Sequence, residues 1–111
     1  MHPQIKESDW KLLRRLTPVA LERFCRSALA EINRVTSDSG EGYHERFLEV
    51  FYLVNKLNDE LGRAFDDHRR SNARQKLTVI MQGQLLTAEE FSRFSPETRE
   101  AVNVLLKIFG Q

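Results

Sequence analysis

The sequence predicts an all-α fold, a small bundle of four or five helices built around one long central helix. Three observations support this prediction. Apolar residues recur every three or four positions over long segments, a hydroxyl residue precedes two of the three prolines, and no Asn-Gly or Asp-Gly turn joins two alternating runs. The length of 111 residues fits a single domain, 1–111. With 41% hydrophobic and 30% charged residues, the composition is typical of globular proteins.

The N-terminal third predicts two helices, 9–16 and 18–35. Ser8 is the expected cap of the first helix, and Trp10, Leu13 and Leu16 would form its one narrow apolar face. Thr17-Pro18 places a hydroxyl before a proline, which predicts a fresh helix start. The apolar positions of the second helix follow the three-then-four spacing closely: they are Leu21, Phe24, Cys25, Ala28, Leu29, Ile32 and Val35.

A polar loop with two glycines at 36–42 precedes the predicted central helix, 43–82. No glycine or proline interrupts residues 66–72, so we expect one continuous or slightly bent helix; the alternative is a new helix near Ala73, capped by Ser71 or Asn72. At 1.5 Å per residue the helix would be ~60 Å long, longer than a compact domain of this size needs. We therefore expect a second copy of the chain to bury the part of the helix that extends beyond the domain. One face would be buried, consisting of Phe47, Val50, Phe51, Val54, Leu57, Leu61 and Phe65.

Two short helices, 88–94 and 96–109, complete the predicted bundle. Gly83 is expected to end the central helix at the C′ position. Thr87 and Glu90 have the spacing of a capping box, and Ser95-Pro96 has that of an N-cap followed by a first-turn proline.

Residues 77–94 resemble the SHOCT-type short helical hairpin found at the C-terminus of bacterial proteins. The likeness lies in Gly83-Gln84-Leu85-Leu86-Thr87-Ala88-Glu89-Glu90-Phe91, because that module joins its helices with a Gly, an apolar pair, a Thr and Glu-Glu-Phe. The chain departs from the pattern by inserting Gln84 and by placing Ser95-Pro96 where a Lys-rich helix would continue. The resemblance implies an assembly or interaction role in a bacterial protein.

The sequence offers no catalytic, cofactor or metal site, and we expect no enzyme. It lacks a phosphate-binding loop, a nucleophile elbow and a His-Glu-x-x-His motif. Glu41 and His44 have the Glu-x-x-His spacing of di-metal bundles, but the further ligands of such a site are missing. Asp66 and Asp67 would point about 100° apart on a helix and so cannot share one ion. Cys25, the one cysteine, is expected to be a small buried hydrophobe.

The net charge of +1 hides a local separation of charge. Residues 63–76 contain five basic and two acidic side chains, whereas residues 87–100 contain four acidic and two basic ones. The basic stretch allows an alternative function, a small DNA-binding transcriptional regulator. Its contacts would come from Arg69, Arg70, Asn72, Arg74, Gln75 and Lys76. The other interpretation is a salt-bridged surface in which the acidic segment folds back on the basic one or pairs with it across a dimer.

We therefore expect a non-catalytic protein–protein interaction module, a small bacterial or phage regulatory or inhibitory protein that binds a partner's surface as a homodimer. Leu48 and Tyr52 extend the apolar face of the central helix and would contact the partner, unless they pack on the first or last helix. The arginines Arg69, Arg70 and Arg74 would add charge complementarity. A cytoplasmic location is expected, because no signal-peptide pattern and no apolar run of ~18 residues occur.

Overall fold

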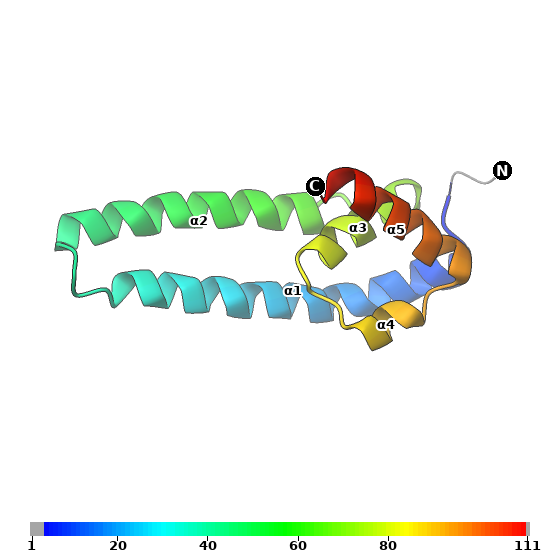
Figure 1. The fold of residues 1–111 in the computed structure, drawn as a ribbon, viewed down its shortest axis with the longest axis horizontal. Coiled ribbons are helices and arrows are strands. Elements are labelled where there is room, and N and C mark those ends of the chain that lie inside the picture. The colour runs from blue at the N-terminus through cyan, green and yellow to red at the C-terminus, as the bar shows by residue number, and fades with distance from the viewer. Residues whose placement is uncertain (1–3, 111) are drawn as a thin grey trace.

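A computed structural model describes residues 4–110 and confirms the all-α class (Figure 1). Within these residues the chain forms five α-helices, one 3₁₀ turn and no strand. In order they are α1 Glu7–Thr36, α2 Tyr43–Phe65, the 3₁₀ turn η1 Arg70–Asn72, α3 Ala73–Gln82, α4 Ala88–Ser92 and α5 Pro96–Phe109. The longest helix is α1 rather than the expected 43–82.

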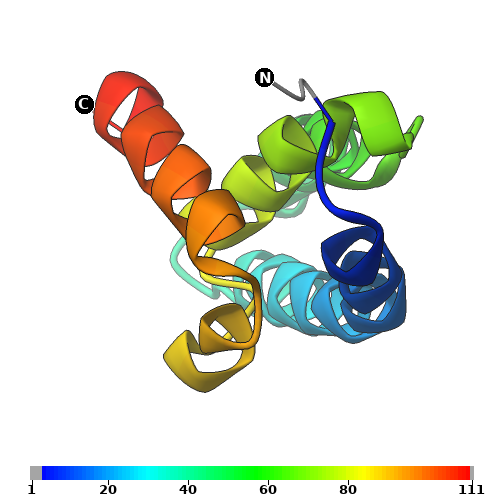
Figure 2. The same cartoon turned by 90° about the vertical axis from the view of Figure 1, so that its right-hand side faces the viewer.

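Helices α1 and α2 form a long antiparallel hairpin, and α3, α4 and α5 gather at one end of it (Figure 1). Seen end-on, α4 and α5 lie on one side of the α1–α2 pair, while no helix of the described residues covers the opposite side (Figure 2). The molecule measures 57 × 23 × 23 Å, with a radius of gyration of 16.7 Å. A compact domain of this length would have about 13 Å. The hairpin therefore projects well beyond the core, and we call residues 21–57 the arm and the remainder the base.

The predicted break at Thr17-Pro18 is wrong, because α1 runs continuously through Pro18. Proline cannot donate the backbone hydrogen bond to residue 14, and a proline inside a helix costs ~3 kcal/mol. Leu13 and Leu16 before it and Ala20 after it are buried in one core, and this shared burial keeps the helix continuous through the site. The Thr17 hydroxyl does not cap a new helix; it donates to the Leu13 carbonyl at 2.7 Å.

The predicted start of the first helix at Asp9, capped by Ser8, is also wrong. Helix α1 begins at Glu7, and Asp9 is buried inside the molecule. Its carboxylate accepts hydrogen bonds from the Ser95 backbone N–H at 3.0 Å, the Ser95 hydroxyl at 2.5 Å and the Thr98 hydroxyl at 2.7 Å. These bonds compensate the burial of a charge and tie the start of α5 to α1.

The prediction of a single helix over 43–82 is wrong as well. Helix α2 ends at Phe65, and α3 begins at Ala73, where the alternative prediction placed the start of a new helix. Asp67 adopts a left-handed backbone conformation with φ of 57°. The turn is held by Asn72, whose side chain donates to the Asp67 carbonyl at 2.8 Å and accepts from the Arg69 N–H at 2.9 Å. The turn folds α3 back so that Ala73, Leu77 and Ile80 complete the core of the base.

The C-terminal elements lie close to their predicted positions. Helix α5 spans 96–109, as expected, whereas α4 ends at Ser92, two residues early. Gly83 follows α3 but is not the left-handed residue; Gln84 is, with φ of 57°. The Gln84 N–H donates to the Met81 carbonyl at 3.0 Å and the Leu85 N–H to the Ile80 carbonyl at 3.2 Å, which is a Schellman motif. The SHOCT-like segment 77–94 is thus the end of α3, this turn and α4.

The core lies almost entirely in the base. It joins the first half of α1, the end of α2, α3, the loop after it, one residue of α5, and single residues before α1 and between α4 and α5. The members are Ile5, Leu12, Leu13, Leu16, Ala20, Ala64, Ala73, Leu77, Ile80, Leu85, Leu86, Phe94 and Val102. In the arm, by contrast, Val35 and Leu57 are the only residues classed as fully buried. The arm consequently has two helices but little core of its own.

Candidate interaction surface

Large apolar side chains remain exposed along one side of the arm. Phe47 is 69% exposed and Phe51 55%, although both were expected in the buried face of the central helix. On α1, Leu29 is 66% exposed and Leu21 is exposed as well. An aromatic side chain carries about 150–250 Å² of surface, so the two phenylalanines alone expose roughly 200–300 Å². Apolar patches above a few hundred Å² are typical of interaction sites in soluble proteins.

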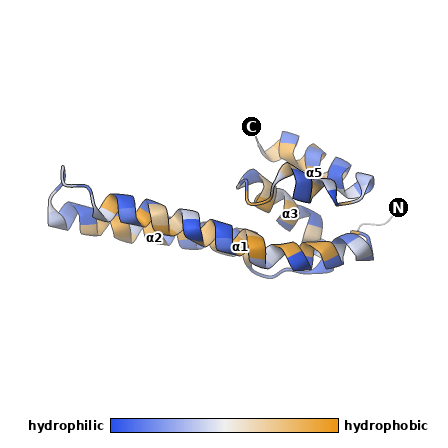
Figure 3. Ribbon diagram, turned by 90° about the horizontal axis from the view of Figure 1, so that it is seen from below, coloured by the Kyte–Doolittle hydropathy of each residue, from blue (hydrophilic) through white to orange (hydrophobic). Residues whose placement is uncertain are grey.

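These side chains form one continuous surface, because their spacings put them on the same side of each helix. Leu21, Cys25 and Leu29 are four residues apart on α1, and Phe47, Phe51 and Val54 follow each other by four and three on α2. In Figure 3, where the two helices of the arm overlap, hydrophobic stretches recur along the arm, and α3 and α5 lie above its base end. We name this surface the arm face and define it as Leu21, Cys25, Leu29, Ile32, Phe47, Phe51 and Val54.

A shallow groove of about 270 Å³ runs along the arm face between the two helices. Leu29, Ile32 and Val54 line it toward the tip of the arm, and Phe24 and Leu61 line it toward the base. Cys25, expected to be buried, is half-buried and lines this groove next to Phe24. Asn58 is the one polar side chain among its lining residues, all of which lie in the described part of the chain. An elongated, uncharged groove of this kind suits the apolar stripe of another helix.

The arm face continues into a hollow of about 410 Å³ in the base. We name it the base hollow; it is lined by Trp10, Arg14, Thr17, Pro18, Phe65 and His68. The Arg14 guanidinium lies 5.9 Å from the centroid of the Trp10 ring, within the range of a cation–π contact. The hollow therefore offers an aromatic wall and a positive charge beside the uncharged groove.

The opposite side of the arm tip is acidic. Glu45 and Glu49 are each two residues from Phe47, which places them on the far side of α2. Hydrogen bonding to Glu49 raises the pKa of Glu41 to about 7, and burial together with the neighbouring Asp38 and Glu45 carboxylates adds to the shift. The arm tip thus has one apolar side and one charged side.

The predicted partner-binding residues do not come together. Leu48 is 37% and Tyr52 66% exposed at the outer edge of α2, beside Phe47 and Phe51. Tyr52 lies edge-on to Phe51, with ring centroids 5.5 Å apart. Thirteen residues of α2 separate Tyr52 from Phe65, about 20 Å, and the three arginines lie beyond that point. The sequence prediction therefore combined the edge of the arm face with residues of the base.

The basic stretch is engaged within the chain. Arg70 donates to the Ile5 carbonyl at 3.0 Å and Arg74 to the Gln4 carbonyl at 3.3 Å, so both hold the segment before α1. Arg69 pairs with Asp67 at 2.8 Å, and Lys76 donates to the Arg63 carbonyl at 2.8 Å. Asn72 stabilises the α2–α3 turn, as described above. Gln75 lines a cavity of about 530 Å³ between α3 and α5, together with Arg63 and Phe109.

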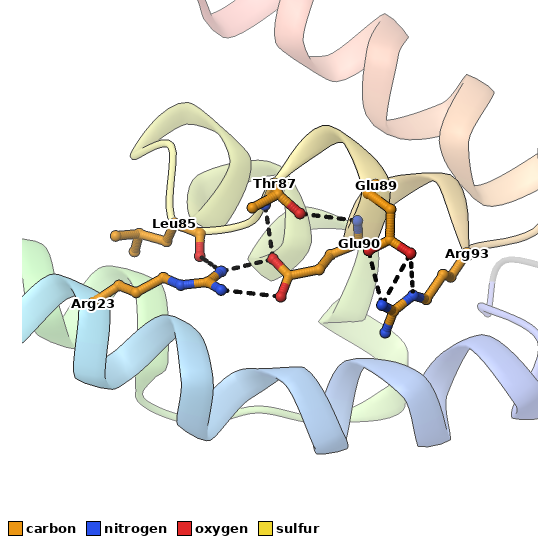
Figure 4. Close-up of polar contacts among 6 residues, drawn as sticks. All are labelled: Arg23, Leu85, Thr87, Glu89, Glu90 and Arg93. Carbon is orange, nitrogen blue, oxygen red and sulfur yellow. Dashed lines mark hydrogen bonds and ion pairs between the residues drawn. The ribbon is translucent and has the colours of Figure 1, made fainter.

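The acidic segment 87–100 does not pair with this basic stretch in the described residues. Its ion pairs run from Glu90 to Arg23 at 2.6 Å, from Glu97 to Lys6 at 2.6 Å and from Glu89 to Arg93 at 2.8 Å. The Arg23 contact is the most enclosed of them, and Arg23 also donates to the Leu85 carbonyl at 2.9 Å (Figure 4). The interpretation in which the acidic segment folds back on residues 63–76 is therefore wrong.

No three His, Cys, Asp or Glu side chains of residues 4–110 are grouped so that they could hold a metal ion. No helix in the same part of the chain is both long enough and apolar enough to cross a membrane. Comparisons of the chain with protein-family models, with curated proteins and with solved structures found no match.

Proposed function

We propose that this chain is a non-catalytic interaction module that binds an α-helical surface of a protein through its arm face. The observation that carries the proposal is the exposure of Phe47, Phe51 and Leu29 on one side of a helical hairpin that has little core of its own. Burial of apolar surface is the main favourable term in protein association. The arm face offers such surface together with a shallow groove lined almost entirely by apolar side chains.

The arm face supports this function better than the basic stretch supports DNA binding. A recognition helix needs arginines and lysines that are free to reach phosphates. Arg70, Arg74 and Lys76 instead donate to backbone carbonyls of their own chain, and Arg69 pairs with Asp67. Leu48 and Tyr52 keep a role in the proposal as the rim of the arm face, and Arg69, Arg70 and Arg74 as residues that hold the base together.

Photo-crosslinking in the native cells tests the proposal. A benzophenone analogue of phenylalanine at position 51 would lie in the arm face, and the same analogue at position 108 would replace Ile108, which is 62% exposed on α5. We expect a discrete protein adduct from position 51 that disappears when Phe47→Glu is added, and none from position 108. Absence of any adduct at position 51 would contradict the proposed function.

A further inference from the structure

We infer that a second copy of this chain covers the arm face. In this dimer the two α1 helices run antiparallel about a two-fold axis close to Cys25, and the tip aromatics Phe47 and Phe51 of each copy lie over the base hollow of the other. The inference rests on the proposed function and names the partner for the same surface. The combined hairpins form a four-helix bundle, the arrangement in which two apolar helical hairpins complete one core.

The area of the surface matches what a stable dimer requires. The arm face and the base hollow together extend from Trp10 to Phe47, whose neighbour Arg46 contacts Thr36. From Trp10 to Thr36, α1 rises over 26 residues, or about 39 Å. Two adjacent helices are about 20 Å wide, which gives about 800 Å² on each copy. A standard protein–protein interface buries about 800 Å² per partner. A single docked helix would cover only about half of this width.

The spacing along α1 is self-complementary. Leu21 and Leu29 lie four residues before and after Cys25, and Pro18 and Ile32 lie seven residues before and after it. A two-fold axis at Cys25 therefore puts Leu21 of one copy opposite Leu29 of the other, and the same contact occurs twice, as two-fold symmetry demands. Pro18 of one copy likewise lies opposite Ile32 of the other, so both pairs set one apolar side chain against another.

The two ends of the surface also complement each other. Arg14 in the base hollow lies 11 residues before Cys25, about 16 Å along α1. Phe47 lies a similar distance on the other side, because its neighbour Arg46 donates to the carbonyl of Thr36, 11 residues after Cys25, at 2.9 Å. Phe51 lies one helical turn closer to Cys25, as Pro18 does on the opposite side. An antiparallel pair consequently sets Phe47 and Phe51 over Arg14, Pro18 and Phe65 of the partner copy. There the Arg14 guanidinium gains further aromatic faces to contact.

The charge distribution agrees with this partner. The groove of the arm face is uncharged, so a partner that brought a charge into it would lose hydration without a counter-ion. A second arm face brings none. The acidic side chains Glu45 and Glu49 lie on the far side of α2 and remain in solvent in this arrangement.

The mass of the particle tests the second copy. We expect light scattering or sedimentation to give 26 kDa, twice the chain mass of 13.0 kDa, and the pair Phe47→Glu with Phe51→Glu to give the mass of one chain. The matched control, Val104→Glu with Ile108→Glu, changes two exposed apolar residues of α5 and should remain dimeric. Circular dichroism identifies variants that have lost helix. A wild-type monomer at high protein concentration overturns the inference.

The native cysteine tests the antiparallel arrangement. An added copper–phenanthroline oxidant, which accepts the two electrons as two thiols lose their protons and form a disulfide, should join Cys25 to Cys25 in the dimer. Cys25→Ser should abolish this product. A dimer sensitive to Phe47→Glu but without the cross-link overturns the antiparallel register. If the wild type is monomeric and the photo-crosslinker at position 51 still forms an adduct with a protein of another mass, the second copy is ruled out and the proposed function stands. If position 51 gives no adduct, both the second copy and the proposed function are ruled out.

Discussion

Glu90 is the residue that joins α4 most firmly to α1. Its carboxylate accepts two hydrogen bonds from Arg23, at 2.6 and 3.1 Å, and another from the Thr87 N–H at 2.8 Å (Figure 4). The Arg23 guanidinium, followed by the hydrogen bond from Thr87, lowers the pKa of Glu90 to about 2. One side chain thus serves the capping box of α4 and a tertiary ion pair together, and only the first of these roles is visible in the sequence.

We expect Glu90→Gln to lower the free energy of unfolding by about 1–2 kcal/mol at pH 7, because a partly enclosed charge-assisted hydrogen bond is lost. The pKa of Glu90 is lower in the folded chain than the ordinary value of about 4.3 in the unfolded one. Its contribution is therefore complete above about pH 5 and is lost as the pH falls toward 2. Urea unfolding of both proteins across this range should show their difference shrinking as the pH falls.

Glu89→Gln is the matched control for this experiment. Glu89 is adjacent and pairs with Arg93 at 2.8 Å, but both partners are more than half exposed. A surface pair of this kind is worth about 0–1 kcal/mol. Equal losses for Glu89→Gln and Glu90→Gln would contradict the special role of the Arg23 contact.

Gln84 occupies a backbone position that favours glycine, with φ of 57° after α3. The left-handed conformation costs an L-residue roughly 1–2 kcal/mol, whereas glycine adopts it freely but loses more entropy on folding. We expect Gln84→Gly to stabilise the chain by about 0.5–1 kcal/mol in thermal or urea unfolding. Gln82→Gly, placed on the last residue of α3, should instead destabilise it. A loss of stability from Gln84→Gly would contradict the Schellman geometry.

At the scale of elements, the accuracy of the sequence prediction depended on how local the deciding interactions are. The capping box of α4 and the Ser95 cap of α5 involve residues at most three apart, and both occur as predicted. The continuity of α1 through Pro18 and the turn at residues 66–69 depend on Leu13, Ala20 and Leu77 meeting in one core. These are tertiary contacts between residues far apart in the sequence, and helical periodicity does not predict them.

The arm face was missed for a related reason. Phe47, Phe51 and Val54 follow the helical spacing of a core stripe, and the same stripe serves a core or an interface. The spacing shows which residues of α2 lie on the same side of the helix, but it does not show which of its sides packs against α1. Leu48 and Tyr52, which the sequence singled out, lie at the edge of that stripe.

Pro18 destabilises helix α1, and the burial of neighbouring α1 residues in the core of the base offsets this loss. We expect Pro18→Ala to raise the free energy of unfolding by about 1–3 kcal/mol, because alanine restores the hydrogen bond to residue 14 and is a far better helix former. Pro96→Ala is the control, since Pro96 occupies the first turn of α5, where proline is favoured. Equilibrium urea unfolding measures both. If Pro18→Ala brings no gain, another constraint on α1 must replace the missing hydrogen bond.

At the scale of the whole molecule, the base and the arm differ in what holds them together. The base buries its apolar residues within one chain, whereas the arm leaves Leu29, Phe47 and Phe51 to be covered by a partner. Regions with few buried apolar contacts open at lower free energy than the rest of a protein. Binding to the folded form stabilises it further in proportion to the logarithm of partner concentration. In a self-associating chain, the partner concentration is the protein concentration itself.

Hydrogen exchange measured at several protein concentrations should therefore separate the two parts. In dilute solution we expect backbone amides of residues 25–36 and 43–54 to exchange much faster than those of residues 12–20 and 73–80, which supply much of the core. As the concentration rises, exchange in the arm should slow while exchange in the base changes little, because association covers the arm face first. The pair Phe47→Glu with Phe51→Glu should keep the arm fast at every concentration. Uniform exchange that does not respond to concentration would mean that the arm is stable alone and needs no second copy.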